Sequence, residues 1–210
     1  DSRLTGVIAG IHDRRSETQK QLVAARKRLK RDDFEASAQA LVKRVRWRGD
    51  LPEPAFVDVA RQSLRTAVDE FLEAAAADLS DMPHLHAMRL AGKRLRYTME
   101  LLAGVFEPAF KKRLYSVVQE IQDKIGRVND HVTAAALLEQ WATEPDARDA
   151  ELLSQLAAEE LGFAESTRRQ FQKWWSPRRV DELRREFDRV KVVEPRGKEQ
   201  PVDRPNRGIA

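Results

Sequence analysis

The side chains best suited to chemistry in this sequence are the cations of the segment 86–97, which reads HAMRLAGKRLRY. Four ionisable residues of this segment recur at spacings of three and four: His86, Arg89, Lys93 and Arg96. On an α-helix this spacing aligns them along one side over about 15 Å, at about 1.5 Å of rise per residue. Arginine can bind two phosphate oxygens at once and lysine acts as a point charge, so this line suits a linear polyanion, above all a chain of phosphates.

A second set of residues, displaced by one position, predicts how the same helix packs. Its members are apolar or small and also recur at spacings of three and four: Leu85, Met88, Gly92, Leu95, Met99, Leu102 and Phe106. At about 100° per residue, the cations lie roughly a quarter turn from this packing seam, at the edge of the buried face. Tyr97 falls on the cationic side, whereas Arg94 projects elsewhere. Cations that are partly withdrawn from water are costly unless an anion neutralises them.

The anion that neutralises these cations can be a ligand or the protein itself. In the second case the side chains extend to the surface and pair with acidic groups of neighbouring helices. The sequence leaves both interpretations open. The same choice applies to further clusters that could complete a basic pore: Arg26, Lys27 and Lys30; Lys111, Lys112 and Arg113; Arg168, Arg169 and Lys173.

Composition limits the class of protein. The chain has 210 residues with 41% hydrophobic and 34% charged residues, which fits a helical globular protein. It has no cysteine, so disulfides and thiolate chemistry are excluded. The net charge of +4 is unevenly distributed, at +6 over residues 1–50, −3 over residues 54–80 and +5 over residues 86–127. Two basic regions thus flank an acidic one, a pattern that can attract an anionic ligand.

Hydrophobic periodicity predicts an all-α fold of antiparallel helical bundles with short loops. The expected helices cover residues 3–29, 34–47 after a cap at Asp32–Asp33, 54–79, 83–104, 108–142 with an interruption at Gly126, 145–174, and 177–190 after a cap at Ser176. The aromatic residues Phe163, Phe171, Trp174, Trp175 and Trp47 are expected in the core. Residues 191–210 lack periodicity and are expected to be disordered.

A second polar segment, 121–130, reads IQDKIGRVND. Its pairs Gln122–Asp123 and Asn129–Asp130 are seven residues apart, so they share one side of a helix if Gly126 does not bend it. The two aspartates could orient the cations, and the two amides could donate hydrogen bonds to phosphate. A polar helix surface with a local cap is the alternative.

Segments 86–97 and 121–130, in this order and separation, resemble the two hallmark motifs of the CHAD (conserved histidine α-helical domain) family. The resemblance implies two pseudo-symmetric four-helix halves around a basic pore that binds inorganic polyphosphate without catalysis. It marks six positions of this chain for that role: His86, Arg89, Lys93, Arg94, Arg96 and Tyr97.

The first eighty residues depart from this family pattern, because none of them forms a second His-x-x-Arg helix, and the residues after His12 do not fit. The expected organisation is therefore the remainder of a first half without its opening helices (1–80), a second half (81–190) and a tail (191–210).

Other function classes find weaker support. The chain has no phosphate-binding glycine loop and no His-Glu-x-x-His zinc motif, so we expect no enzyme, metal or cofactor. Nucleic acid is the alternative polyanion, but Tyr97 is the only stacking platform among the cations. A phosphate-metabolising enzyme and a plain scaffold are further alternatives. No apolar run is long enough to span a membrane, and a cytoplasmic location is expected, with polyphosphate granules as one place within it.

Overall fold

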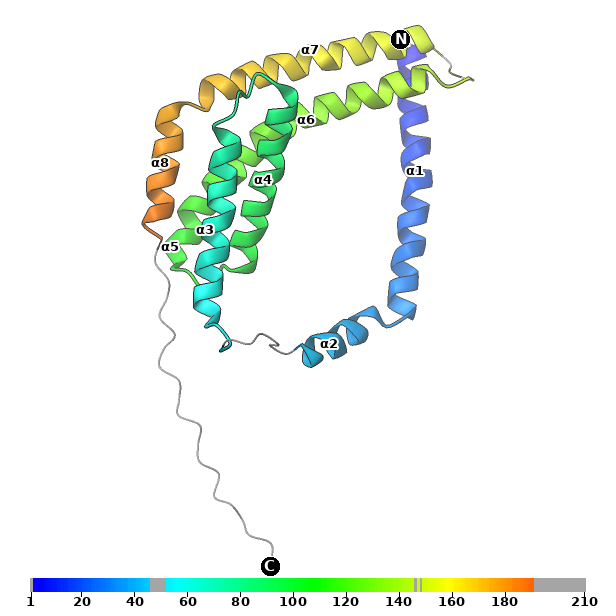
Figure 1. Ribbon diagram of the computed structural model, residues 1–210. Coiled ribbons are helices and arrows are strands. Elements are labelled where there is room, and N and C mark those ends of the chain that lie inside the picture. Colours follow the sequence, from blue (N-terminus) through cyan, green and yellow to red (C-terminus); the bar gives the residue numbers. More distant parts are fainter. Residues whose placement is uncertain (1, 46–51, 146, 148, 191–210) are drawn as a thin grey trace, which may run out of the picture. The chain divides into compact units, whose positions relative to one another are not determined.

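The computed structural model describes residues 2–45, 52–145, 147 and 149–190, and every regular element in these ranges is a helix (Figure 1). In chain order the elements are α1 (Ser2–Arg31), α2 (Phe34–Arg44), α3 (Phe56–Ala75), α4 (Met82–Leu101), α5 (Pro108–Phe110), the π-helical turn η1 (Lys111–Tyr115), α6 (Ser116–Ala142), α7 (Ala150–Trp174) and α8 (Pro177–Asp188). The predicted all-α fold is confirmed. The expected disordered tail, 191–210, and Trp47 lie outside the described residues.

The contacts divide the chain into two compact units, each built from two stretches of sequence. Unit 1 comprises Asp1–Pro54 and Arg127–Thr167, and unit 2 comprises Ala55–Gly126 and Arg168–Ala210. The predicted halves, 1–80 and 81–190, rest on family resemblance rather than on contacts, and their boundary stays a prediction.

Several helix ends differ from the expected ones. Asp33 precedes α2 as expected, but its backbone is left-handed (φ 47°) and its side chain makes no capping hydrogen bond. Helix α3 ends at Ala75, four residues early, and α7 begins at Ala150, five residues late. Gly126 does not interrupt α6, which runs continuously from Ser116 to Ala142. The cap at Ser176 is confirmed, because its hydroxyl accepts a hydrogen bond from the Arg179 amide at 3.4 Å.

Unit 2 has a dense apolar core. Helix α3 packs against α4 and α8, and η1 packs against α4 and α8. The largest fully buried side chains of this unit are Phe71, Leu85, Met88, Leu95, Met99, Val118, Ile121 and Ile125. Trp175 joins them through an edge-on contact with Phe71 at 6.1 Å and a stacked contact with Phe171 at 6.2 Å between ring centroids. The expected core positions of Phe171 and Trp175 are confirmed, whereas that of Phe163 is wrong, because it is 55% exposed in unit 1.

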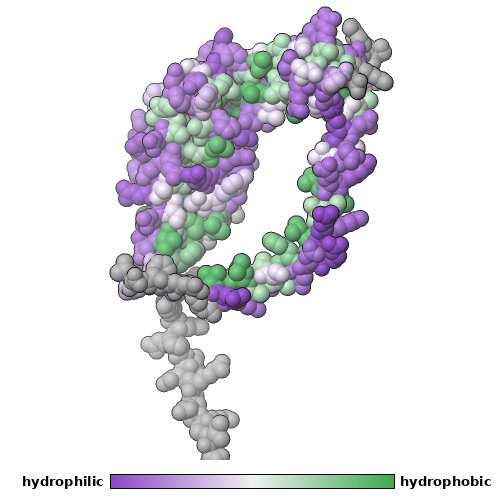
Figure 2. Space-filling view, turned by 45° about the vertical axis from the view of Figure 1, so that its right-hand side comes forward, coloured by the Kyte–Doolittle hydropathy of each residue, from purple (hydrophilic) through white to green (hydrophobic). Residues whose placement is uncertain are grey.

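Unit 1 has a smaller core of alanine and leucine. Its buried cluster consists of Ala135, Leu138, Leu153 and Ala157, with Val7, Trp141, Ala142 and Leu156 packed against it. Helix α2 buries none of its residues, and much apolar surface of α1 and α2 is exposed, as the hydrophobic patches along them show (Figure 2). None of the described helices is long and apolar enough to cross a membrane.

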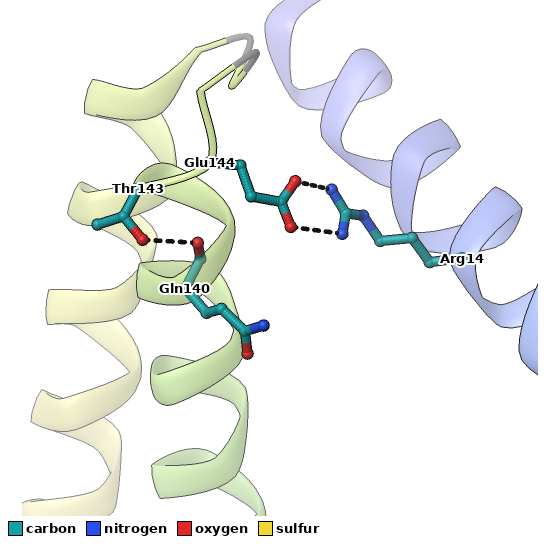
Figure 3. Close-up of polar contacts among 4 residues, drawn as sticks. All are labelled: Arg14, Gln140, Thr143 and Glu144. Atoms are coloured by element: carbon teal, nitrogen blue, oxygen red, sulfur yellow. Dashed lines mark hydrogen bonds and ion pairs between the residues drawn. The ribbon is translucent and has the colours of Figure 1, made fainter.

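A bidentate ion pair joins α1 to the loop after α6. The Arg14 guanidinium donates to both carboxylate oxygens of Glu144, at 2.9 and 2.5 Å (Figure 3). The same guanidinium lies 4.8 Å from the ring centre of Trp141. Near it, the Thr143 hydroxyl donates to the Gln140 carbonyl at 2.8 Å and closes the end of the helix. The hydrogen bond and charge of Arg14 lower the pKa of Glu144 below its ordinary value of 4.5.

This lowered pKa predicts a pH-dependent stability. Because the folded protein favours ionised Glu144, the stabilisation is complete above pH 4.5 and is lost as the pH falls through the folded-state pKa. We expect Glu144→Gln to lower the melting temperature at pH 7 by a small amount, since the pair is exposed. The difference from the unsubstituted chain should shrink below about pH 4, and an equal difference at both pH values would contradict the assignment.

Candidate functional site

Helix α4 positions the cationic side chains through its packing seam. All seven predicted seam residues are buried, from Leu85 to Phe106. Arg89, Lys93 and Arg96 are half-buried beside them, as the offset of one residue predicts. His86 and Tyr97 are exposed, and Tyr97 retains 51% of its surface. We call Arg89, Lys93 and Arg96 the cation row.

The beginning of α4 is fixed by the loop that precedes it. Pro83 stands in its first turn, where its lack of an N–H group costs no hydrogen bond. In this loop the Ser80 amide donates to the Asp78 carboxylate at 2.9 Å, and the contacts with Ser80 lower the pKa of Asp78. The first intrahelical bond already reaches the amide of Leu85, so His86, the fifth residue of α4, stands just past the free N–H groups of the helix start.

The basic residues of α4 differ in how they are neutralised. Arg94 projects away from the cation row, as expected, and forms an ion pair with Glu70 of α3 at 2.6 Å. No described carboxylate lies within 4.0 Å of the side-chain nitrogens of Arg89 or Lys93. The row therefore contains two partly buried charges that the described protein does not neutralise by ion pairing.

Arg96 is intermediate between these cases. Its Nε lies 3.7 Å from the Glu100 carboxylate, and its guanidinium lies 5.0 Å from the ring centre of Tyr97. The same Nε is buried and has no hydrogen-bond partner among the described residues. An ion pair of this length leaves Arg96 only partly compensated.

Glu100 ends the row with a negative charge. The Tyr115 hydroxyl, at the last position of η1, donates to the Glu100 carboxylate at 2.7 Å. This hydrogen bond, together with desolvation and the negative charge, raises the pKa of Tyr115 above its ordinary value. No pattern in the sequence points to this contact, because Tyr115 is brought to Glu100 by the π-helical turn and not by a regular helical spacing.

The two hallmark segments meet at Gly92 and Gln122. Gln122 is only 8% exposed, and its amide nitrogen donates to the Arg89 carbonyl at 3.4 Å. A Cβ atom on Gly92 would lie 2.1 Å from that nitrogen and 3.3 Å from Phe71. Only glycine at position 92 therefore leaves room for the Gln122 side chain in its present position. The sequence allowed the Gln122 amide to donate a hydrogen bond to phosphate. In the structure this amide instead donates to the backbone of α4.

The other predicted site residues are dispersed. Lys112, Asp123 and Lys173 are exposed in unit 2, and Asp123 has no described ion pair with the cation row. Arg168 donates to the Ser80 carbonyl of the loop before α4. Four residues lie in unit 1 and are described with it: Arg26, Lys30, Asn129 and Asp130. Arg26 and Lys30 are exposed on α1, and the Asn129 amide donates to the Thr133 hydroxyl at 3.3 Å.

A stack of cations on Trp174 was not predicted from the sequence. Lys124 of α6 lies 4.8 Å and Arg179 of α8 lies 4.4 Å from the ring centre of Trp174. Arg179 follows Trp174 by five residues across the turn between α7 and α8, but Lys124 is fifty residues away in sequence. No local spacing could therefore reveal the stack. Since both cations already contact the ring, Trp174 is engaged within the protein.

No metal site is formed by the described side chains, which include no group of three potential His, Asp or Glu ligands. His84, the nearest histidine to His86 in sequence, instead contacts the Asp78 carbonyl at 3.1 Å. His131 of unit 1 pairs with Glu160 at 2.6 Å. Both histidines thus make polar contacts within the protein.

Comparison with known families identifies the chain. The family model of the CHAD domain matches residues 2–139, a span that contains both hallmark segments. The chain belongs to the CHAD domain family. The CHAD domain is itself a non-catalytic helical domain. No curated protein and no solved structure matches the chain in the corresponding searches.

The contact at Gly92 predicts a specific stability effect. Replacing glycine by alanine inside a helix ordinarily stabilises a protein by about 0.5–1 kcal/mol. Gly92→Ala must displace the buried Gln122 amide, which costs about 1–3 kcal/mol if it is left without a partner. We therefore expect Gly92→Ala to lower the free energy of unfolding, by up to about 2 kcal/mol, in urea titrations.

Gly162 provides the matched control, because it lies inside α7 and no other group lies within 4 Å of the place that a Cβ atom would take. Gly162→Ala should stabilise the chain by the ordinary amount. If Gly92→Ala stabilised it equally, the close approach of Gln122 would have no energetic weight.

Proposed function

We propose that the chain binds inorganic polyphosphate along the cation row of α4 and does so without catalysis. The observation that supports this most directly is the partial burial of Arg89 and Lys93 without a described carboxylate partner. Partly desolvated cations of this kind are stabilised when an anion supplies the missing charge. Arg89, Lys93 and Arg96 are four and three positions apart, so they present their charges one after another along one side of the helix.

Membership of the CHAD family adds to this proposal, since the domain occurs in polyphosphate-related proteins. A chain of phosphates carries a charge at every unit and no bases, so it needs a line of cations and no stacking platform. The cation row offers such a line, with Tyr97 as its one neighbouring exposed aromatic residue. The phosphates of a nucleic acid could bind the same cations, but stacking or reading of its bases would need more aromatic or base-reading groups than Tyr97. In a cell, such a binder would act where polyphosphate accumulates, for example at granules in the cytoplasm.

The first test removes the cations of the row one at a time. We expect Arg89→Ala and Lys93→Ala each to weaken binding of long-chain polyphosphate about tenfold at about 150 mM salt, since a charged hydrogen bond contributes about 1.5–3 kcal/mol. Arg61→Ala is the control, because this exposed α3 arginine is already paired with Asp58 at 3.1 Å. Arg61→Ala removes the same charge and should leave the affinity nearly unchanged.

The contrary outcomes are distinct. Equal affinity of all three variants would remove the cation row from the site. Tighter binding of RNA or duplex DNA than of polyphosphate in direct competition would favour the nucleic-acid alternative. Release of orthophosphate in the presence of Mg²⁺ would show an enzyme and contradict the non-catalytic proposal.

A second test concerns the acidic end of the row. Glu100 competes with a bound phosphate for Arg96, so Glu100→Gln should tighten binding about fivefold, corresponding to about 1 kcal/mol for an exposed pair. Tyr115→Phe removes the hydrogen bond that holds the Glu100 carboxylate. It leaves the negative charge free to approach Arg96, so it should weaken binding. Isothermal titration of both variants checks this opposite sign, and a shift in the same direction would contradict the competition.

A further inference from the structure

Helix α1 presents an apolar seam that no described part of unit 1 covers. Eight positions follow spacings of four and three along the whole helix: Leu4, Ile8, Ile11, Arg15, Thr18, Leu22, Ala25 and Leu29. This is the heptad pattern of a helix that pairs with another helix. We call these positions the α1 seam. Its five large apolar side chains keep 39–64% of their surface exposed.

Most of the α1 seam lies away from the face that attaches α1 to the rest of unit 1, and Ile11 stands at the edge between the two, beside the cavity that Trp141 also lines. Val7 packs on the unit's small core, and Arg14 contacts Trp141 and Glu144. At about 100° per residue, Val7 and Arg14 lie about 50–70° around the helix from the centre of the seam. Two neighbours at such an angle are compatible, as in a helical bundle. The seam can therefore receive a second helix while α1 keeps its present contacts.

The α1 seam is complementary to itself when two copies run antiparallel. If the symmetry axis passes between Ser16 and Glu17, each seam residue of one copy faces a seam residue of the other copy, and the two residue numbers add up to 33. The four facing pairs are Leu4 with Leu29, Ile8 with Ala25, Ile11 with Leu22, and Arg15 with Thr18. The six apolar positions meet apolar partners, and the two polar positions meet each other.

Charge distinguishes this arrangement from the others. In a parallel pair Arg15 would face its own copy, and the basic end of the helix, residues 26–31, would lie beside a second basic end. The antiparallel pair moves the basic ends apart by about 40 Å, at about 1.5 Å per residue. A shift by one heptad would place Arg15 against Ile11 or Ala25, which is unfavourable for a charge in an apolar layer.

The residues that flank the seam agree with this register. In the antiparallel pair the neighbouring positions bring Arg14 beside Gln21, and His12 beside Gln19. Nearer the ends, Arg28 stands beside Val7 and Arg26 beside Thr5. None of these contacts joins two cations, although α1 is rich in them.

We propose that this chain forms a symmetric homodimer through antiparallel pairing of α1 with α1 of a second copy. The proposal is independent of what the cation row binds. It assigns the exposed apolar surface of α1 to an interface in which the same residues contribute from both copies, as two-fold symmetry requires.

Sedimentation equilibrium of the full chain tests the interface. We expect a dimer at micromolar concentration, and a roughly tenfold weaker association for Leu22→Glu, which places a charge opposite Ile11. Val23→Glu is the matched control, because Val23 is also exposed, at 50%, but stands next to the seam and not in it. Circular dichroism should show equal helix content in both variants, since each side chain is exposed in the monomer.

Two results would overturn the proposal. The first is a monomer at every concentration up to about 100 μM. A seam that binds only a helix of another protein would give this result. The second is a dimer that resists Leu22→Glu, because its interface would lie elsewhere.

The chain has no cysteine, so engineered cysteines can test the orientation without background. The double variant Ile11→Cys with Leu22→Cys should form a disulfide-linked dimer under mild oxidation. The two positions are about 16 Å apart within one helix, which is too far for a disulfide inside one chain. Ile11→Cys alone should stay unlinked, because it faces Leu22 of the other copy. Efficient linkage of this single variant would show parallel pairing and overturn the antiparallel one.

Discussion

The contact of the Gln122 side chain with α4 at Gly92 is the constraint on which the candidate site depends. The Gln122 amide occupies the space that any side chain at position 92 would need, and it bonds to the carbonyl of Arg89. The backbone of the cation row is thereby held from behind by a buried polar contact, while its side chains face outward. A site of this kind needs a rigid backbone more than it needs rigid side chains, because long cations can adjust to a flexible polyanion but cannot correct a misplaced helix.

The balance of charges in unit 2 separates residues that serve stability from those available to a ligand. Arg94 has a near carboxylate, Glu70, and Lys124 has both Glu120 at 3.6 Å and the ring of Trp174. Arg89 and Lys93 have neither kind of described neighbour. Lysine and arginine can bury their alkyl stems and keep the charge in water, but any part of the charge that is withdrawn from water is stabilised by a counter-charge. Retaining two half-buried cations in a row is understandable if an external anion provides the charge.

Much of this could be predicted from the sequence, because it depends on local periodicity. The seven positions of the packing seam follow from a spacing of three and four, and the half-burial of the row follows from its displacement by one residue. The same reasoning separated Arg94 from the row. Each of these conclusions needs only the geometry of a single helix.

The errors and omissions of the sequence prediction have a different origin. Gly126 has open space around it, and its low helix propensity is outweighed by the contacts of the long helix α6, which stays continuous. Phe163 was assigned to the core by residue type alone, but its position on α7 faces outward. The contacts of Tyr115 with Glu100 and of Gln122 with Gly92 join distant segments, so no local pattern contains them.

The two units also differ in how far each can bury its own apolar side chains. Unit 2 encloses aromatic and long aliphatic residues, whereas the buried cluster of unit 1 consists of alanine and leucine from α6 and α7, with Val7 of α1 packed against it. A helix of this length gains most of its stability by packing an apolar face, and α1 exposes one along its entire length.

The cations of α1 do not make that face a solvated one. They cluster at one end of the helix and beside the seam rather than within it, with Arg15 as the exception. The exception lies at the centre of the helix, where two-fold antiparallel pairing brings it against Thr18, whose hydroxyl is already bonded to the Arg14 carbonyl at 3.0 Å. A polar pair at the symmetry axis weakens the association but fixes its register, and that combination is expected of a surface selected to meet its own copy rather than any apolar helix.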